Sequence, residues 1–415
     1  MSNQINSTLG DLVKTGGGII HTGPFGSQLH AEDYVAQGIP CIMPANMKDN
    51  RVDLSNISYI SEGDAQRLSK YLVKEGDIVY SRRGNVTLKA LIRKNEAGYF
   101  CGTGCLLLRS GNLLDSEYLT YYLSTKKIQS WIISQSIGAT MPNINTGILA
   151  RIPFSGPEKV IQEKISSVLR AIDDKIALNN RINTELEAMA KTLYDYWFVQ
   201  SDFPDANGKP YKTSGGKMVY NGTLKREIPA GWTVQALSQI SNITMGQSPA
   251  GESYNEDGVG TLFFQGSTDF GWLFPTPRQY TTSPARMAKK GDILLSVRAP
   301  VGDMNISNAD CCIGRGLAAL NSKSHSDGFL FYVMKYFKQV FDRRNAEGTT
   351  FGSMTKDDLH SLQVVCPEPG LLKRYDDIVT GYNKMIFTRS LENQDLIKLR
   401  DWLLPLLMNG QITVK

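Results

Sequence analysis

The sequence predicts an α/β (α+β) fold in which two similar globular units alternate with two long helices that pair as an antiparallel coiled coil. Three observations support this prediction. Residues 157–199 contain no glycine and, after Pro157, no proline, and their apolar side chains recur with the 3-4 spacing of a coiled-coil seam. The same spacing recurs 210 residues further along the chain. Strand and turn segments ahead of the helices also recur, at offsets of 210 to 215 residues.

The two predicted helices span residues 156–200 and 369–415. A helix of about 40 residues is a rod of roughly 60 Å, and it cannot bury an apolar seam without a partner. The second seam is weaker, because Glu392 stands at the position of Ile182 and Gly381 lowers helical propensity. The residues expected to pair the helices are Ile165, Val168, Ile172, Ile182, Leu186, Met189, Leu193 and Tyr196, and then Tyr375, Ile378, Tyr382, Leu396, Leu399 and Leu403.

The first globular unit is predicted over residues 1–155. Glycine-rich turns, strand-like alternation and one helical pattern follow each other along it. The expected elements are turns at 16–18 and 23–27, strands at 39–45, 57–60, 78–80 and 99–108, a helix at 118–133 and a polar loop at 138–145.

The second globular unit is predicted over residues 231–368, after a break in composition at 201–230. This break is rich in glycine, proline and lysine, which is typical of an exposed linker. The second unit repeats the first with drifting offsets, because residues 291–298 match 76–83 and residues 329–341 match 118–131. Loop lengths therefore differ while the framework is kept, as expected for one scaffold that carries two recognition surfaces.

Composition excludes several classes of protein. No run approaches the ~18 apolar residues of a membrane span, and residues 1–14 lack a basic-then-apolar signal pattern, so we expect a cytoplasmic protein. The six cysteines and four histidines do not form a zinc-finger spacing, so no metal site is predicted. A net charge of +5 allows a polyanionic partner without requiring one.

The best chemical signal is a Ser-x-Arg sequence at the end of a strand in both units, which places Arg83 and Arg298 at equivalent positions. Guanidinium groups suit phosphates and the guanine edge, and the sequence leaves open which of the two is contacted. Other polar residues of the same loops could contact base edges. The full set of predicted DNA contacts is Ser27, Asn46, Lys48, Arg82, Arg83, Lys89, Asn143 and Asn145, and then Gln265, Ser267, Thr268, Arg298, Arg315, Thr349 and Thr350.

Motifs for catalysis are missing from the sequence. It contains no phosphate-binding Gly-x4-Gly-Lys-Ser/Thr loop, and no Asn/Asp-Pro-Pro-aromatic motif, with which amino-methyltransferases hold a flipped adenine. The Gly-x-Gly sequences at 102–104 and 314–316 lie inside repeated strands with no helix start after them, unlike a dinucleotide-binding site. We therefore predict no catalytic residues in this chain.

Two variable units, each followed by a long helix, resemble the specificity subunit of type I restriction–modification systems. The resemblance covers nearly the whole chain. The stretches that carry it are GPFGS (23–27), GDIVYSRRG (76–84), GKMVYNGTLKREIPAGW (216–232), GDILLSVRAPVG (291–302), IGRGLAAL (313–320) and LLPLLMNGQI (403–412).

The resemblance implies that each globular unit is a target recognition domain for one half of a bipartite site in double-stranded DNA. It also implies two modification subunits, which carry S-adenosylmethionine and methylate adenine, and restriction subunits with ATP- and magnesium-dependent translocase and nuclease activity. The chain itself would bind no cofactor and catalyse nothing. The alternatives are a stand-alone adenine methyltransferase with duplicated recognition domains, against which the missing motif argues, and a coiled-coil scaffold without nucleic acid.

Overall fold

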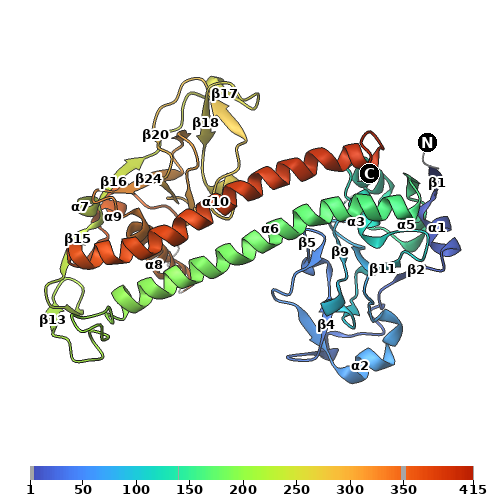
Figure 1. The fold of residues 1–415 in the computed structure, drawn as a ribbon, viewed down its shortest axis with the longest axis horizontal. Coiled ribbons are helices and arrows are strands. Elements are labelled where there is room, and N and C mark those ends of the chain that lie inside the picture. Colours follow the sequence, from blue (N-terminus) through green and yellow to red (C-terminus); the bar gives the residue numbers. More distant parts are fainter. Residues whose placement is uncertain (1–3, 139, 347–351, 415) are drawn as a thin grey trace. The chain divides into compact units, whose positions relative to one another are not determined.

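The computed structural model describes residues 4–138, 140–346 and 352–414, and the chain divides into two compact units (Figure 1). The first unit comprises Met1–Ile176 and Asp395–Lys415, and the second comprises Ala177–Gln394. Each unit therefore contains one globular domain and part of both long helices. This division differs from the sequence-based boundaries, which gave each helix a segment of its own.

The first unit is built on two four-stranded sheets. The antiparallel sheet has the order β2 (Ile19–Thr22), β11 (Cys105–Arg109), β8 (Ile78–Ser81) and β9 (Lys89–Leu91). The mixed sheet has the order β10 (Phe100–Cys101), β4 (Ile39–Ile42), β7 (Ser58–Ile60) and β3 (Tyr34–Val35), with β10 and β4 parallel. Two short pairs join β1 (Ile5–Thr8) to β12 (Pro153–Gly156) and β5 (Met47–Lys48) to β6 (Arg51–Val52). The helices are α1 (Leu9–Thr15), α2 (Glu62–Arg67), α3 (Ser116–Tyr122), α4 (Lys126–Gln135) and α5 (Thr146–Ala150).

The second unit repeats this plan. Its antiparallel sheet has the order β16 (Ser241–Met245), β24 (Leu317–Ser322), β21 (Ile293–Ser296) and β22 (Met304–Ile306). Its mixed sheet has the order β17 (Tyr254–Asn255), β19 (Gln279–Thr281), β18 (Thr261–Phe264), β23 (Cys311–Ile313) and β20 (Met287–Ala288), with β18 and β23 parallel. Two antiparallel pairs join β13 (Met218–Asn221) to β14 (Arg226–Pro229) and β15 (Thr233–Ala236) to β25 (Gln363–Cys366). The helices are α7 (Leu237–Ile240), α8 (Asp327–Ala346) and α9 (Lys356–Ser361).

The repeated strands β8 and β21 lie in equivalent surroundings. All four residues of each are buried, as their hydrophobic sequences predict for a central strand. Each strand follows a turn closed by a buried aspartate, because Asp77 accepts the backbone N–H of Lys74 and Asp292 accepts that of Lys289, both at 2.8 Å. The same residue types thus form the same turn twice.

Three expected elements differ from the structure. The predicted helix at 118–133 is interrupted between α3 and α4, and the predicted strand at 99–108 is interrupted by a turn between β10 and β11. Residues 201–230 are not only a linker, because they contain the β13–β14 hairpin, and Ile228 lies in the core of the second unit.

The long helices are α6 (Lys159–Tyr194), which continues as a π-helical turn at Asp195–Val199, and α10 (Pro369–Met408). Both helices contribute to the core of each unit. In the first unit Ile165 and Leu169 of α6 share a buried cluster with Leu407 and Met408 of α10. In the second unit the aromatic end of α6 and the start of α10 complete the core, where Phe198 and Tyr375 have ring centroids 4.9 Å apart.

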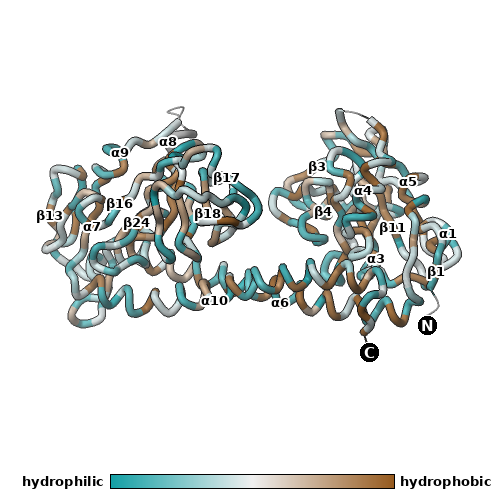
Figure 2. The backbone as a smooth tube through the Cα atoms, turned by 90° about the horizontal axis from the view of Figure 1, so that it is seen from above, coloured by the Kyte–Doolittle hydropathy of each residue, from teal (hydrophilic) through white to brown (hydrophobic). Residues whose placement is uncertain are grey.

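Between these apolar ends the seam is polar. Asn179 and Asn183 are fully buried. Figure 2 shows hydrophilic stretches along both α6 and α10. The amide of Asn179 donates to Asn393 Oδ1 at 2.9 Å, and that of Asn183 donates to Ser390 Oγ at 3.3 Å. The partner number falls as the α6 number rises, so the helices are antiparallel in this segment, as predicted.

The positions of the seam were predicted only in part. Ile165, Ile172 and Tyr375 are buried, and Val168, Ile182, Leu186, Leu193, Tyr382, Leu396 and Leu403 are half-buried. Four predicted seam residues are exposed to 38% or more, and these predictions were wrong: Met189, Tyr196, Ile378 and Leu399. Buried positions that the 3-4 pattern missed are Leu169, Ala190, Val379, Ile386 and Leu407. The missed positions arise because each domain covers a face of its helix wider than a coiled-coil seam.

Replacing Leu407 by alanine should destabilise the first unit by about 2–5 kcal/mol, because it leaves a cavity in the core formed by residues near the start of the chain. Hydrogen exchange of the strands in the first unit measures this loss. Trp402, 60% exposed on the same helix, provides the control, and its replacement by alanine should leave exchange unchanged. Unchanged protection in the Leu407 variant would show that α10 does not stabilise this domain.

Candidate nucleic-acid interface

In the first unit, three loops meet around the glycine turn at residues 102–105. Three backbone hydrogen bonds hold them there: Gly23 N–H donates to Cys105 O at 2.8 Å, Arg82 N–H to Gly104 O at 2.8 Å, and Gly102 N–H to Ile42 O at 2.9 Å. The loops that follow β2, β4 and β8 therefore emerge at one end of the domain.

The second unit gathers its loops in the same way around residues 314–317. Gly246 N–H donates to Leu317 O at 2.9 Å, Val297 N–H to Gly316 O at 2.9 Å, and Gly314 N–H to Phe264 O at 2.8 Å. Because these bonds use backbone atoms alone, they place few demands on the side chains of the loops.

The loops that follow β2 and β16 each begin with a glycine, Gly23 and Gly246, and close backbone packing explains why. A Cβ at Gly23 would lie 2.2 Å from Gly102 O, and one at Gly246 would lie 2.1 Å from Gly314 O. No side chain fits such a close approach of two backbones. Gly23 of the GPFGS sequence therefore has a structural role, whereas a Cβ at Gly26 would meet no atom within 4 Å.

The two Ser-x-Arg sequences form the same turn. The buried Ser81 hydroxyl donates to Arg83 O at 3.0 Å, and the buried Ser296 hydroxyl donates to Arg298 O at 2.8 Å. Both arginine side chains are exposed, and neither makes an ion pair within the described part of the chain. Each turn thus presents a guanidinium group that is free to bind an anion or two base acceptors.

Several predicted contacts of the first unit lie around this turn or on exposed segments. Asn143, half-buried, is bridged through its backbone to Arg83. Ser27 and Lys48 are exposed. Asn145 is exposed, but its side chain accepts the N–H of Ile148 at 2.8 Å and so caps α5. Arg82 is half-buried, and its Nε has no hydrogen-bond partner among the described residues.

Asn46 and Lys89 do not face solvent, so their prediction as DNA contacts was wrong. Asn46 is 4% exposed, and its amide accepts Met43 N–H at 3.1 Å and donates to Asp53 O at 3.2 Å, so it stabilises a turn. Lys89 is 3% exposed and pairs with Tyr80 across the β8–β9 ladder. Burial lowers the pKa of Lys89 from its ordinary value to about 7.

In the second unit two of the predicted DNA contacts, Gln265 and Arg315, are joined by hydrogen bonds to the same serine, Ser248. Ser248 Oγ lies 2.9 Å from Gln265 Nε2, and Arg315 Nε donates to the same hydroxyl at 3.4 Å. No sequence pattern singled out Ser248, because an isolated serine in a loop is common. Ser267 is half-buried and Thr268 is exposed, while Thr349 and Thr350 lie outside the described residues.

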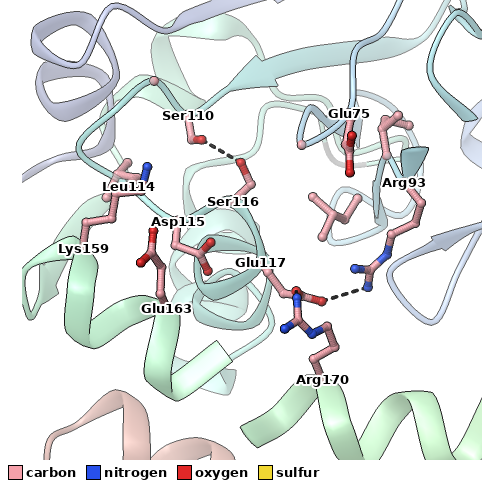
Figure 3. Close-up of a pocket in the computed structure, with 14 residues that line it drawn as sticks. Glu75, Arg93, Ser110, Leu114, Asp115, Ser116, Glu117, Lys159, Glu163 and Arg170 are labelled. Atoms are coloured by element: carbon pink, nitrogen blue, oxygen red, sulfur yellow. Dashed lines mark hydrogen bonds and ion pairs between the residues drawn. The ribbon is translucent and has the colours of Figure 1, made fainter. Parts of the chain in front are cut away.

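Charged residues also line the joint between the first domain and its helix. A cavity of about 290 Å³ lies at this joint. Figure 3 shows Glu117 of α3 on its lining, close to Arg93 and to Arg170 of α6, and both arginines form ion pairs with it. The ion-pair distances are 2.9 Å and 3.1 Å. Because the carboxylate of Glu117 pairs with Arg93 of its own domain and with Arg170 of α6, this group ties the domain to the helix.

The described residues contain no candidate metal site, no disulfide and no helix suited to span a membrane. They contain no group of three or more His, Cys, Asp or Glu side chains placed to hold a metal ion. All six cysteines are free thiols, five of them buried. No helix among the described residues is long and apolar enough to cross a membrane.

Comparison with known proteins gives a consistent result. Residues 6–188 and 229–370 match the family described as type I restriction modification DNA specificity domain. A Methanocaldococcus jannaschii protein named for the MjaX specificity subunit of a type I restriction enzyme is 29% identical over 389 residues, which are 91% of this chain and 88% of that protein. The HindI specificity subunit of Haemophilus influenzae is 23% identical, over 88% and 92% of the two chains. The crystal structure of an S subunit from M. genitalium has a similar fold, with a TM-score of 0.59 and 18% identity over 98% and 96% of the chains.

Replacing Lys89 by methionine, the residue at the equivalent position 304, should stabilise the first unit at pH 7. In the wild type the unfolded lysine binds a proton more tightly than the folded one, so stability rises as pH increases from about 7 towards 10.5. The variant should lose this rise, and its advantage should shrink by pH 10. Urea unfolding at both pH values measures the effect, with the exposed Lys48→Met as the control. If Lys89→Met and the wild type have the same free energy of unfolding at pH 7, then burying the amine does not cost stability and the prediction is wrong.

Proposed function

The chain belongs to the family of type I restriction–modification DNA specificity domains, and we propose that it reads the two halves of a bipartite DNA target, one with each unit. The observation that carries this proposal is the duplicated turn that presents Arg83 and Arg298, both exposed and without an ion pair to any described residue, beside loops of different sequence. Arginine is the side chain best suited to guanine edges and to phosphates.

The partners follow from the same family membership. We propose that modification subunits dock on the helices and carry S-adenosylmethionine, and that they flip and methylate an adenine in each half-site. Restriction subunits would supply the ATP- and magnesium-dependent steps. One related structure is titled for the complex assembly and conformational transition of the type I system, which supports an assembly in general terms. In this proposal the chain supplies recognition and its partners supply catalysis.

The loops of the two units support separate half-sites. The first unit offers Arg83 with Asn143, whereas the second offers Arg298 together with the Gln265, Ser248 and Arg315 group. The backbone hydrogen bonds beneath them are the same. Two different sets of donors on one framework are what a bipartite, asymmetric target requires.

Replacing each arginine separately should affect one half-site only. If Arg83 contacts a base, its alanine variant should lose about 1–3 kcal/mol of discrimination at one position of the first half-site, and Arg298→Ala should do so in the second. A phosphate contact would weaken binding to all sequences alike and reduce the salt dependence. Co-expression with the cognate modification subunit, followed by mapping of methylated adenines, distinguishes these outcomes. Arg226→Ala, an exposed arginine of the β13–β14 hairpin, is the control. Unchanged methylation and affinity in both loop variants would remove these turns from the interface.

The isolated chain should transfer no methyl group from labelled S-adenosylmethionine to DNA, because it lacks the motif that holds a flipped adenine. Adding the cognate modification subunit to the same reaction should restore transfer and serves as the positive control. Turnover by the chain alone would replace the proposal with that of a stand-alone methyltransferase.

A further inference from the structure

The second unit contains a cavity of about 500 Å³ where its domain meets α10. Segment 272–273, strand β22 and helix α8 form the remaining walls, and one side chain of α6, Glu187, reaches it. Its apolar lining consists of Trp272, Leu273, Met304, Ile306, Phe331 and Phe387. Trp272 is 52% exposed, whereas most tryptophan side chains are largely buried. An exposed aromatic ring at the edge of a cavity is available to contact a ligand. The volume and the aromatic lining are those of small-molecule sites.

The first unit has the same joint, but the place equivalent to Trp272 is nearly filled there, and the neighbouring cavity of about 290 Å³ is lined mainly by charged and polar side chains. The backbone identifies the equivalent residues, because Leu273 O accepts the N–H of Ile306 at 2.7 Å as Asn50 O accepts that of Leu91 at 3.0 Å. The corresponding cavity, lined by Asn50 and Leu91, has a volume of only about 10 Å³. The fold therefore does not require an open space at this place.

Polar side chains fill this place in the first unit. Arg51 pairs with Asp174 of α6 at 2.8 Å, and the Tyr121 hydroxyl donates to Asp173 at 2.6 Å. In the second unit Trp272 stands at the position of Asp49, and Phe331 stands at that of Thr120. Two rings thus line the cavity where the first unit has a carboxylate and a hydroxyl, and Phe274 and Lys384 stand at the positions of the paired Arg51 and Asp174.

The charges around the cavity favour an anionic occupant. The two acidic groups of the lining are engaged: Glu187 pairs with Lys335, and Asp327 accepts the N–H of Ser322 at 2.6 Å. By contrast, the side chains of Lys384, Asn383 and His325 make no hydrogen bond or ion pair within the described residues. Lysine and asparagine are hydrogen-bond donors, so the uncommitted groups at this cavity suit a negative group.

A further ammonium lies at the edge of this site. Lys290 Nζ is 5.8 Å from the ring of Phe387, which is one of the lining residues. Its side chain has no carboxylate partner in the described part of the chain. Lys290 and Lys384 therefore give the aromatic cavity a positive surrounding.

We propose that this pocket binds a small aromatic anion, with its ring system against Trp272, Phe331 and Phe387 and its negative group at Lys384 and Asn383. We expect one such site per chain, because the cavities described at the equivalent joint of the first unit have no tryptophan or phenylalanine in their lining. A bound ligand contacts the domain and α10 together, so it stiffens this joint. A side chain of a partner protein is the competing occupant, and the experiment below separates the two.

The test uses 8-anilinonaphthalene-1-sulfonate, an aromatic sulfonate, and N-phenyl-1-naphthylamine, its uncharged counterpart, titrated into the purified full-length chain. We expect saturable fluorescence with one sulfonate bound per chain. Lys384→Glu should weaken the sulfonate about tenfold and leave the neutral compound unaffected, since only the charge contact is lost. Trp272→Ala should weaken both compounds. Asp49→Ala, at the equivalent position of the first unit, is the matched control and should change neither.

Two results would overturn the proposal. One is the absence of a saturable site, or sulfonate binding that is unchanged in Lys384→Glu and Trp272→Ala. The other is complete loss of sulfonate binding when the modification subunit is assembled on the wild-type chain, which would assign the pocket to a protein interface. Thermal unfolding of each variant shows that the fold is retained, and Lys384 is exposed, so its replacement leaves the core intact.

Discussion

The structure depends on the burial of two helical seams that neither helix can bury alone. Helix α10 ends in the core of the domain that begins the chain, where Leu407 and Met408 join Ile165 and Leu169. Helix α6 ends in the core of the other domain, where Trp197 and Phe198 lie close to Tyr375. Each domain is therefore completed by both helices, and the first unit contains residues from both ends of the chain. Apolar burial at the helix ends leaves the middle free to be polar, and there Asn179, Asn183 and Asn393 form hydrogen bonds in place of an apolar seam.

The duplicated framework is kept by interactions that depend little on side-chain identity. The loops of both units are held by backbone hydrogen bonds to a glycine turn, and close backbone contacts require Gly23 and Gly246. Side chains that do contribute to the framework are the same in both copies, as with Asp77 and Asp292. Exposed positions around this framework can change without loss of stability, and in our proposal these are the positions that contact DNA.

The fold was predictable because its signals are long and repeated. Two helices of 36 and 40 residues carry many apolar positions. Each helix needs a partner to bury these positions, so the sequence predicts that the two helices pair. Individual positions were less predictable. Ile378 and Leu399 fit the 3-4 pattern but face solvent, because the domains cover the helices from a direction that the helix sequence does not encode. Lys89 and Asn46 are polar residues in predicted loops or strand edges, yet tertiary contacts bury both. The group of Ser248, Gln265 and Arg315 joins residues far apart in sequence, and only the sheet order brings them together.

The two joints between domain and helix show how duplication allows divergence away from the recognition loops. In the first unit the joint is stabilised by ion pairs, and Arg170 and Arg93 share the carboxylate of Glu117. Removing one partner of such a group would leave a buried charge, so its members have to change together. In the second unit the joint contains an aromatic contact instead, because Phe274 stands at the position of Arg51 and has its ring centroid 4.8 Å from that of Phe387. Apolar contacts tolerate the loss of a neighbour by leaving a cavity, which costs stability but creates no unpaired charge. The two joints therefore differ in the character of their cavities, because the cavity of the second unit is lined by aromatic rings and that of the first unit by charged and polar side chains.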